Sequence, residues 1–332
     1  MRVAWDAPAL SEGQGAIPAH LFFMSFVAGL ATFWGLGWAC FNRTMYSEFV
    51  KSQGVMPKRG KCGLCHQPSL LQESHLIGRA MYKMSREKGF EPVVMTPQFA
   101  THTQKQVKEY MFCSRCEDLF NKGGERYVTG LVFDGESFPL LDRIKLAPFA
   151  GIRMSKGDLE VFSGRKLGIE TEKLAYYAVS LVWRSAVHKW RTLGGQTTTV
   201  EMEEEHKERL RQYLLGHGGL PREMGVSVTV CTDRESQGWV FTPTLSKGSD
   251  FTTHGMTKYG VLVRGLLFHV MVKVPGRFPL DTVCCVKSSE KVLWVRNCRE
   301  ETKRSFDVLN AKARVAENLK KRAATISAEL ES

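Results

Sequence analysis

The chain has 332 residues, of which 43% are hydrophobic and 24% are charged. This composition is typical of a folded globular protein and excludes an intrinsically disordered chain. The formal net charge of +12 at pH 7 favours a polyanionic partner, either nucleic acid or an anionic membrane surface. The nine cysteines are odd in number, and four of them fall in two CxxC pairs. A secreted disulfide framework is therefore excluded, and we expect a reducing compartment, the cytoplasm.

The N-terminal part of the chain contains one long apolar run. Residues 1–20 are polar, and we expect them to lack regular structure. Residues 21–41 contain no charged side chain, which is the length of a transmembrane helix. Basic residues follow the run and favour a cytoplasmic position for the rest of the chain, anchored to the inner membrane. Two alternatives remain open: the run is a buried core helix, or translation begins at Met45 or Met56 and omits it.

The segment 56–130 contains both CxxC pairs, whose members are Cys62, Cys65, Cys113 and Cys116. Zinc in structural sites is bound by four thiolate or imidazole ligands in a tetrahedron, and each CxxC turn can supply two of them. The spacing therefore predicts a structural Zn²⁺ site without an open coordination position. An alternative is a haem-attachment motif, in which His66 follows the first pair. That alternative leaves the second pair without a role.

Two further residues of this segment carry a resemblance. His75 lies between the cysteine pairs in the run Ser-His-Leu-Ile over residues 74–77, and Glu117 directly follows the second pair. This layout resembles the HNH (ββα-metal) nucleases that contain an added zinc knuckle. It is more closely similar to uncharacterised bacterial HNH-like proteins, which continue with a helix of the pattern LSxxWR, matched here by residues 180–184. The resemblance extends over roughly residues 58–215.

The resemblance implies an endonuclease that hydrolyses phosphodiesters with Mg²⁺ or Mn²⁺. His75 would be the general base, Glu117 would bind the divalent metal, and Glu125 is a second acidic candidate. The Asn that orients the His in that family is missing, because Lys108 stands in its place and no Asn occurs between the first His and the second cysteine pair. The nearest polar substitutes are His102, Gln104, Gln106 and Glu109. A catalytically inactive zinc-stabilised module that binds nucleic acid or a protein is therefore the alternative, and in it His75 is structural.

Nucleic acid, DNA or RNA, is the partner that the basic residues around the cysteine pairs predict. Lysine and arginine side chains of this kind neutralise phosphates. They are Lys58, Arg59, Lys61, Arg79, Lys83, Arg86, Lys88, Lys105, Lys108, Arg115 and Lys122.

We expect an α+β fold with a treble-clef-like zinc module, central helices and a C-terminal antiparallel sheet with a terminal helix. Residues 131–220 contain two predicted helices. The first, over 168–190, has apolar residues at three- and four-residue spacing, and the second, over 197–216, begins with a capping box of Thr198 and Glu201. Gly216 favours its end. Residues 221–332 contain β-branched runs, including TVCCVK at 282–287, and then a charged helix over 299–331. No pattern indicates their function or an oligomeric state.

Overall fold

The computed structural model describes ten segments, residues 58–84, 93–95, 100–102, 106–135, 137–153, 159–191, 197–238, 240–245, 256–276 and 278–299. The predicted transmembrane run over 21–41 lies outside these residues, as does the predicted terminal helix from residue 300 onward. Within the described segments, no helix combines the length and the apolar character that crossing a membrane requires. The fold of these segments is α+β, as expected.

The cysteine-bearing segment folds around a three-stranded antiparallel sheet. Its strands, in the order β1-β2-β5, are β1 (Arg59–Lys61), β2 (Pro68–His75) and β5 (Lys108–Cys113). Three short elements connect β2 to β5, namely α3 (Arg79–Met84), β3 (Val93–Met95) and β4 (Ala100–His102). The β2–β5 register shifts between Gln72 and Glu73, and there the Phe112 N–H donates to Ser74 Oγ at 3.1 Å. The buried serine thus satisfies an amide at a bulge that directly precedes His75.

A continuous helical segment follows β5 and widens in its middle. It consists of α4 (Ser114–Phe120), the π-helical turn η2 (Asn121–Glu125) and α5 (Arg126–Val132). A Cβ atom added to Gly124 would lie 2.6 Å from the carbonyl oxygen of Lys173. Glycine at this position therefore allows the next long helix, α7 (Thr171–Val187), to approach the π turn closely.

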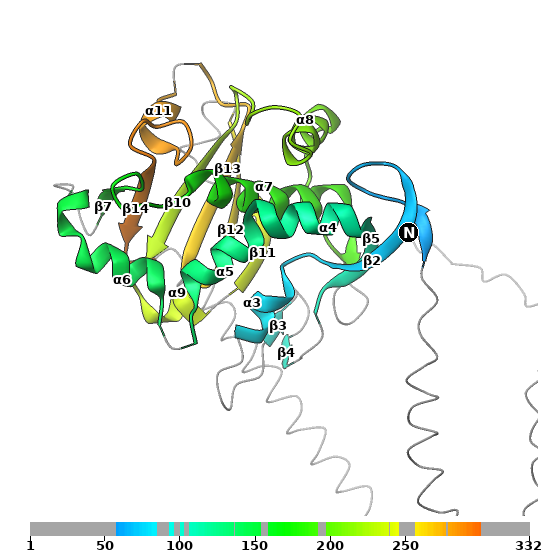
Figure 1. Cartoon of the computed structure of the whole chain (residues 1–332), viewed down its shortest axis with the longest axis horizontal. Helices are drawn as coiled ribbons and strands as arrows, with labels where there is room; N and C mark the ends of the chain where they lie inside the picture. The colour runs from blue at the N-terminus through cyan, green and yellow to red at the C-terminus, as the bar shows by residue number, and fades with distance from the viewer. Residues whose placement is uncertain are drawn as a thin grey trace, which may run out of the picture. The chain divides into compact units, whose positions relative to one another are not determined.

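Helix α7 is buried on nearly every side because it packs against two different sheets. On one side the Tyr177 ring meets Phe268 of the large sheet at 5.8 Å between centroids. On the other side Trp183 stacks on Phe112 of β5 at 6.0 Å. Figure 1 shows α7 running in front of the large sheet toward β2 and β5. The helix predicted over 168–190 is confirmed over Thr171–Val187. The double burial explains why buried residues surround its axis and do not form a single apolar stripe.

The second predicted helix begins later than expected. Helix α8 (Glu204–Leu214) has Glu203 as its N-cap, so the predicted capping box is wrong. Thr198 instead lies in β9 (Thr197–Thr198), which pairs with β8 (Trp190–Arg191). The pattern was ambiguous because threonine favours strands as well as helix caps. The predicted end is confirmed, since Gly216 has a φ of 79° just beyond the helix.

The large sheet has seven strands in the order β11-β12-β13-β10-β14-β7-β6. They are β6 (Gly151–Arg153), β7 (Glu160–Ser163), β10 (Gly225–Cys231), β11 (Val240–Leu245), β12 (Thr257–Val263), β13 (Leu266–Val272) and β14 (Val292–Arg296). The expected antiparallel sheet is wrong in one pairing, because β14 lies parallel to β10. After β13 the chain crosses β10 and joins its other edge, so β14 runs opposite to β13 and parallel to β10. Two of the strands also come from before residue 221, where only helices were predicted.

The run at 282–287 is not a strand, contrary to expectation. It contains the end of α11 (Leu280–Val283) and the turn that follows. Cys284 and Cys285 are both fully buried, whereas consecutive strand residues point to opposite faces. The remaining short helices are α6 (Pro139–Leu146), η3 (Pro148–Ala150) and α9 (Arg234–Gly238). One hydrophobic cluster extends through the described chain from Cys62 to Val295.

Replacing Gly124 by alanine should lower the free energy of unfolding by about 1–3 kcal/mol, the usual cost of overpacking a rigid contact. The contact is with backbone, which cannot rotate away. Denaturant unfolding followed by circular dichroism measures the change. Gly130→Ala is the matched control, because nothing lies within 4 Å of its added Cβ, and it should be neutral or stabilise α5 by about 0.5–1 kcal/mol. Equal stabilities for both variants would contradict the proposed close approach.

Candidate metal centre and adjoining pocket

The four cysteines of the two CxxC pairs converge on one point. Cys62 and Cys65 belong to the turn between β1 and β2, Cys113 ends β5, and Cys116 lies in the first turn of α4. Their four Sγ atoms lie within 4.8 Å of one another, and the Cys65 and Cys113 sulfurs are 3.9 Å apart. Zinc–sulfur bonds of about 2.3 Å in a tetrahedron separate the sulfurs by about 3.8 Å. The cluster can therefore hold a metal ion such as zinc.

Backbone hydrogen bonds shape the first CxxC turn for this role. The Cys62 N–H donates to the Gln67 carbonyl at 2.9 Å, the His66 N–H donates to the Cys62 carbonyl at 2.9 Å, and His66 has a positive φ of 62°. The Cys113 N–H donates to Cys62 Sγ at 3.3 Å. The Cys116 thiol beside Cys62 lowers the pKa of the Cys62 thiol to about 4. These contacts favour the thiolate form of Cys62, the form that zinc requires. In the metal-free cluster, burial raises the pKa of the Cys65 thiol and the hydrogen bond with Cys62 raises that of the Cys116 thiol. All four cysteines converge, unlike in a haem-attachment motif.

A pocket of about 430 Å³ lies directly after the cysteine cluster along β2 and α4. Its lining residues are His75, Gly78, Arg79, Glu117, Asp118, Asn121, Glu125 and Arg184. The structure thus brings His75 and Glu117, the two predicted catalytic residues, to one cavity. They come from different elements, since His75 ends β2 and Glu117 lies on α4.

His75 is half-buried at the edge of this pocket. Burial lowers the pKa of its imidazole, and a side-chain hydrogen bond with Gln106 opposes the shift. Gln106 is one of the four substitutes considered for the missing Asn. Lys108, which stands in the position of that Asn, instead forms an ion pair with Glu73 at 2.7 Å. Gln106, two residues before β5, therefore supplies the amide that contacts the histidine ring.

The helical segment presents three polar residues to the pocket at four-residue spacing. They are Glu117, Asn121 and Glu125. Burial raises the pKa of the Glu117 carboxyl, while Arg184 and the Ser74 hydroxyl oppose the shift. Its Oε1 atom is buried and accepts no hydrogen bond from any residue that the structure describes. Asn121 was missed in the sequence, although its helical spacing from Glu117 is a signal that could have identified it.

Arg184 of α7 closes the inner wall of the pocket. Its side chain is only 2% exposed and its Nη2 lies 2.6 Å from Glu125 Oε1. Nη1 donates to the carbonyl oxygen of His75 at 3.0 Å, and the guanidinium carbon lies 4.0 Å from the centre of the Phe120 ring. The WR pattern that carried part of the resemblance therefore supplies a structural arginine beside the histidine.

The pocket does not contain a compact set of metal ligands. Within the described segments, two groups of three or more potential ligands lie within 4.8 Å, namely the four clustered cysteines and a buried set of Cys231, Asp233 and Cys298. His75 and the pocket carboxylates form no third group of this kind there. An ion such as Mg²⁺ is usually held by one or two carboxylates together with waters and substrate phosphates. The pocket residues suit that open mode of binding and not a closed protein cage.

Only some of the predicted basic residues are available for phosphate. Lys108 and Lys122 form ion pairs with Glu73 and Asp118, at 2.7 and 2.6 Å. The other exposed ones in the described part are Lys58, Arg59, Lys61, Arg79 and Arg115. Three of them lie along β1 and just before it, at the edge of the small sheet.

The cysteine cluster predicts a zinc content of one ion per chain, measured by atomic emission on purified protein. Cys113→Ser should lose most of that zinc and unfold the small sheet, because structural zinc contributes directly to folding. Cys284→Ser is the control, since Cys284 is equally buried but lies outside the cluster. It should retain one zinc per chain. A wild-type protein without zinc would refute the site.

Comparisons with known proteins leave the chain's relationships open. No protein-family model, curated protein or solved structure matches this chain.

Proposed function

We propose that this chain is a metal-dependent nuclease of HNH type, in which a treble-clef zinc site supports the active site. The observation that carries the proposal is the pocket that contains His75, Glu117 and Asn121 directly after the cysteine cluster. The order of a CxxC turn, the antiparallel pair of β2 and β5, and helix α4 agrees with the ββα arrangement that the sequence resemblance implies. Zinc in this reading is a scaffold, because four cysteines leave no coordination position for a substrate.

His75 is the proposed general base. It accepts a proton from a water molecule as that water attacks phosphorus, and the P–O bond to the leaving oxygen breaks. The lowered pKa of His75 keeps the ring neutral and able to accept a proton at pH 7. Gln106 would then act as the positioning residue that the missing Asn provides in the family, since its side chain hydrogen-bonds to His75.

The carboxylate of Glu117 is the proposed ligand for a divalent ion. Its Oε1 accepts no hydrogen bond from a residue that the structure describes. A buried acceptor of this kind costs free energy of folding unless a cation or a water molecule satisfies it. Asn121 and Glu125 line the same wall. When bound there, Mg²⁺ or Mn²⁺ supplies charge stabilisation at the leaving oxygen.

Nucleic acid is the proposed substrate. One exposed cation, Arg79 on α3, lines the pocket. Further exposed cations are Arg115 on α4, two residues before Glu117, and Lys58, Arg59 and Lys61 along β1 and just before it. Contacts of this type bind the phosphate backbone without reading sequence. We therefore propose cleavage with little sequence preference.

Cleavage of plasmid DNA or of structured RNA by the purified full chain, with Mg²⁺ or Mn²⁺, tests the proposal. His75→Ala should reduce the rate by at least about a hundredfold, the usual contribution of a general base. His75 is not a member of the cysteine cluster, so the zinc content should stay the same. Gel electrophoresis of the products measures the rate.

His217→Ala is the matched control for this experiment. His217 is an exposed histidine beyond α8 and its ring bonds to Gln212 at 2.8 Å, far in sequence from the pocket residues. Its variant should cleave like the wild type. If the wild type binds nucleic acid but neither protein cleaves it, the inactive binding module is the correct alternative.

The pH dependence of cleavage should show a limb on the acid side only. Because burial lowers the pKa of His75 below its ordinary 6.5 and the base must be neutral, the rate should rise with pH and become constant before about pH 7. A rate profile at saturating Mn²⁺ measures the midpoint. A midpoint clearly above 6.5 would show that another group is the base.

A further inference from the structure

A second pocket lies on the face of the large sheet that α7 does not cover. Along β10, Val226, Val228 and Val230 belong to the core that contains α7. The residues between them point to the opposite face, and two of these, Ser227 and Thr229, line a pocket of about 240 Å³. The proposed nuclease site contains none of these residues.

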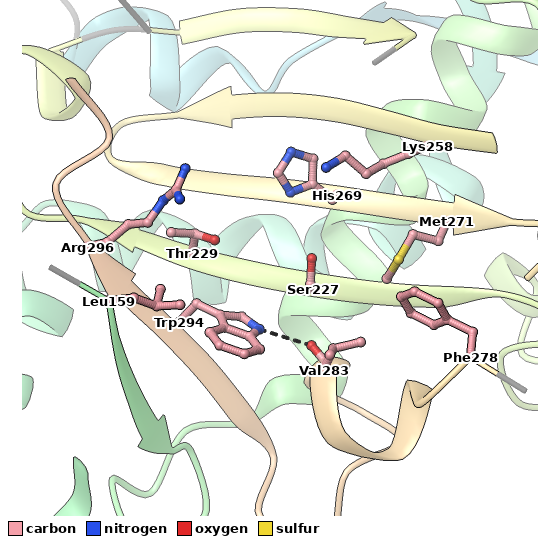
Figure 2. Close-up of a pocket in the computed structure, with 10 residues that line it drawn as sticks. All are labelled: Leu159, Ser227, Thr229, Lys258, His269, Met271, Phe278, Val283, Trp294 and Arg296. Atoms are coloured by element: carbon pink, nitrogen blue, oxygen red, sulfur yellow. Dashed lines mark hydrogen bonds between the residues drawn. The ribbon is translucent and has the colours of Figure 1, made fainter. Parts of the chain in front are cut away.

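Polar side chains from four neighbouring strands meet in this pocket. They are Ser227 and Thr229 of β10, Lys258 of β12, His269 of β13 and Arg296 of β14. Ser227 pairs directly with His269 across the β10–β13 ladder. Figure 2 shows the hydroxyls, the imidazole and the two cationic groups on the same side of the strands. Polar residues in the middle of a sheet face do not help the core, so their convergence suggests a ligand.

An apolar wall completes the pocket on the side of α11. It consists of Trp294, Val283, Phe278, Met271 and Leu159. The Trp294 Nε1–H donates to the carbonyl oxygen of Val283 at 3.1 Å, as the dashed line in Figure 2 shows. This bond holds α11 against β14, so the wall is formed in advance of any ligand.

The lining of the pocket includes two cationic side chains, Lys258 and Arg296. Burial, together with Lys258 and Arg296, lowers the pKa of His269 to about 3, so the ring is neutral at pH 7. Burial, and then Arg296, also lowers the pKa of Lys258. None of the lining residues, all of them in the described segments, has a carboxylate. An anion in the pocket would interact favourably with both cationic side chains.

We propose that this pocket binds a phosphate monoester whose organic group is small and apolar. All five polar side chains can donate hydrogen bonds. This number of donors is larger than the two oxygens of a carboxylate accept well, and it suits the three terminal oxygens of a phosphate ester. Arginine in particular matches phosphate in a two-point contact. The organic group would lie against Trp294 and Phe278. This site does not depend on the proposed nuclease activity.

Isothermal titration calorimetry of the full chain with phenyl phosphate tests the site, with inorganic phosphate and benzoate as comparison ligands at equal ionic strength. We expect one phenyl phosphate per chain, and weaker binding of benzoate. Arg296→Gln should weaken binding about tenfold or more, as the loss of a charge-assisted hydrogen bond does. Thr229→Val keeps the side-chain shape and removes one hydroxyl, so it should fold normally and bind several-fold more weakly.

Two control variants separate the pocket from other anion sites. Arg299→Gln removes the same charge three residues beyond Arg296 and outside the lining, and it should bind like the wild type. His75→Ala changes the other pocket and should also keep the affinity. The proposal is overturned by the absence of saturable binding, by equal weakening in both arginine variants, or by benzoate binding as tightly as phenyl phosphate. A 5′-phosphorylated against a 5′-hydroxyl dinucleotide distinguishes a nucleic-acid end from a free ester as the source.

Discussion

The buried guanidinium of Arg184 joins three parts of this protein that are distant in sequence. It donates to the His75 carbonyl at 3.0 Å, pairs with Glu125 in the π turn at 2.6 Å and stacks on Phe120 of α4. A buried guanidinium without such partners would cost several kcal/mol. The end of β2, the π turn and α7 can therefore not shift independently, because any one shift would leave this charge or the Glu125 carboxylate without compensation.

The cysteine cluster imposes a complementary constraint at the other end of the same elements. A metal ion there would tie the turn before β2 to the end of β5 and the start of α4, whereas Arg184 ties the end of β2 to the helical segment that follows α4. His75 and Glu117 lie between the two constraints. Their relative position is then set by the scaffold before a substrate binds, which is the condition that the proposed general base and metal ligand require.

The cysteine cluster was predictable because its chemistry is local: each CxxC turn fixes two ligands within four residues, so spacing alone indicates the site. Helix α7 was predictable for the same kind of reason, from apolar spacing. The remaining pocket residues depend on contacts across the fold. Arg184 is separated by 109 residues from the carbonyl it binds. Asn121 follows the second cysteine pair, whereas the resemblance implied an Asn before that pair.

The strands β6 and β7 were missed because they are short, with 3 and 4 residues. They are stable only as additions to the edge of the sheet next to β14, and no local sequence pattern shows that pairing.

The strand β10 shows how a single alternating pattern can serve two purposes. Its residues at 226, 228 and 230 are fully buried valines in the core with α7, whereas Ser227 and Thr229 line the pocket on the opposite face. Apolar residues at those two positions would bury more surface and stabilise the sheet further. The same holds for Lys258 and His269, which lie in interior strands of the sheet and whose charged forms are disfavoured by burial. These polar residues lie together on one face of adjacent strands, where each of them lowers the stability of the sheet. A bound ligand explains this grouping better than folding does.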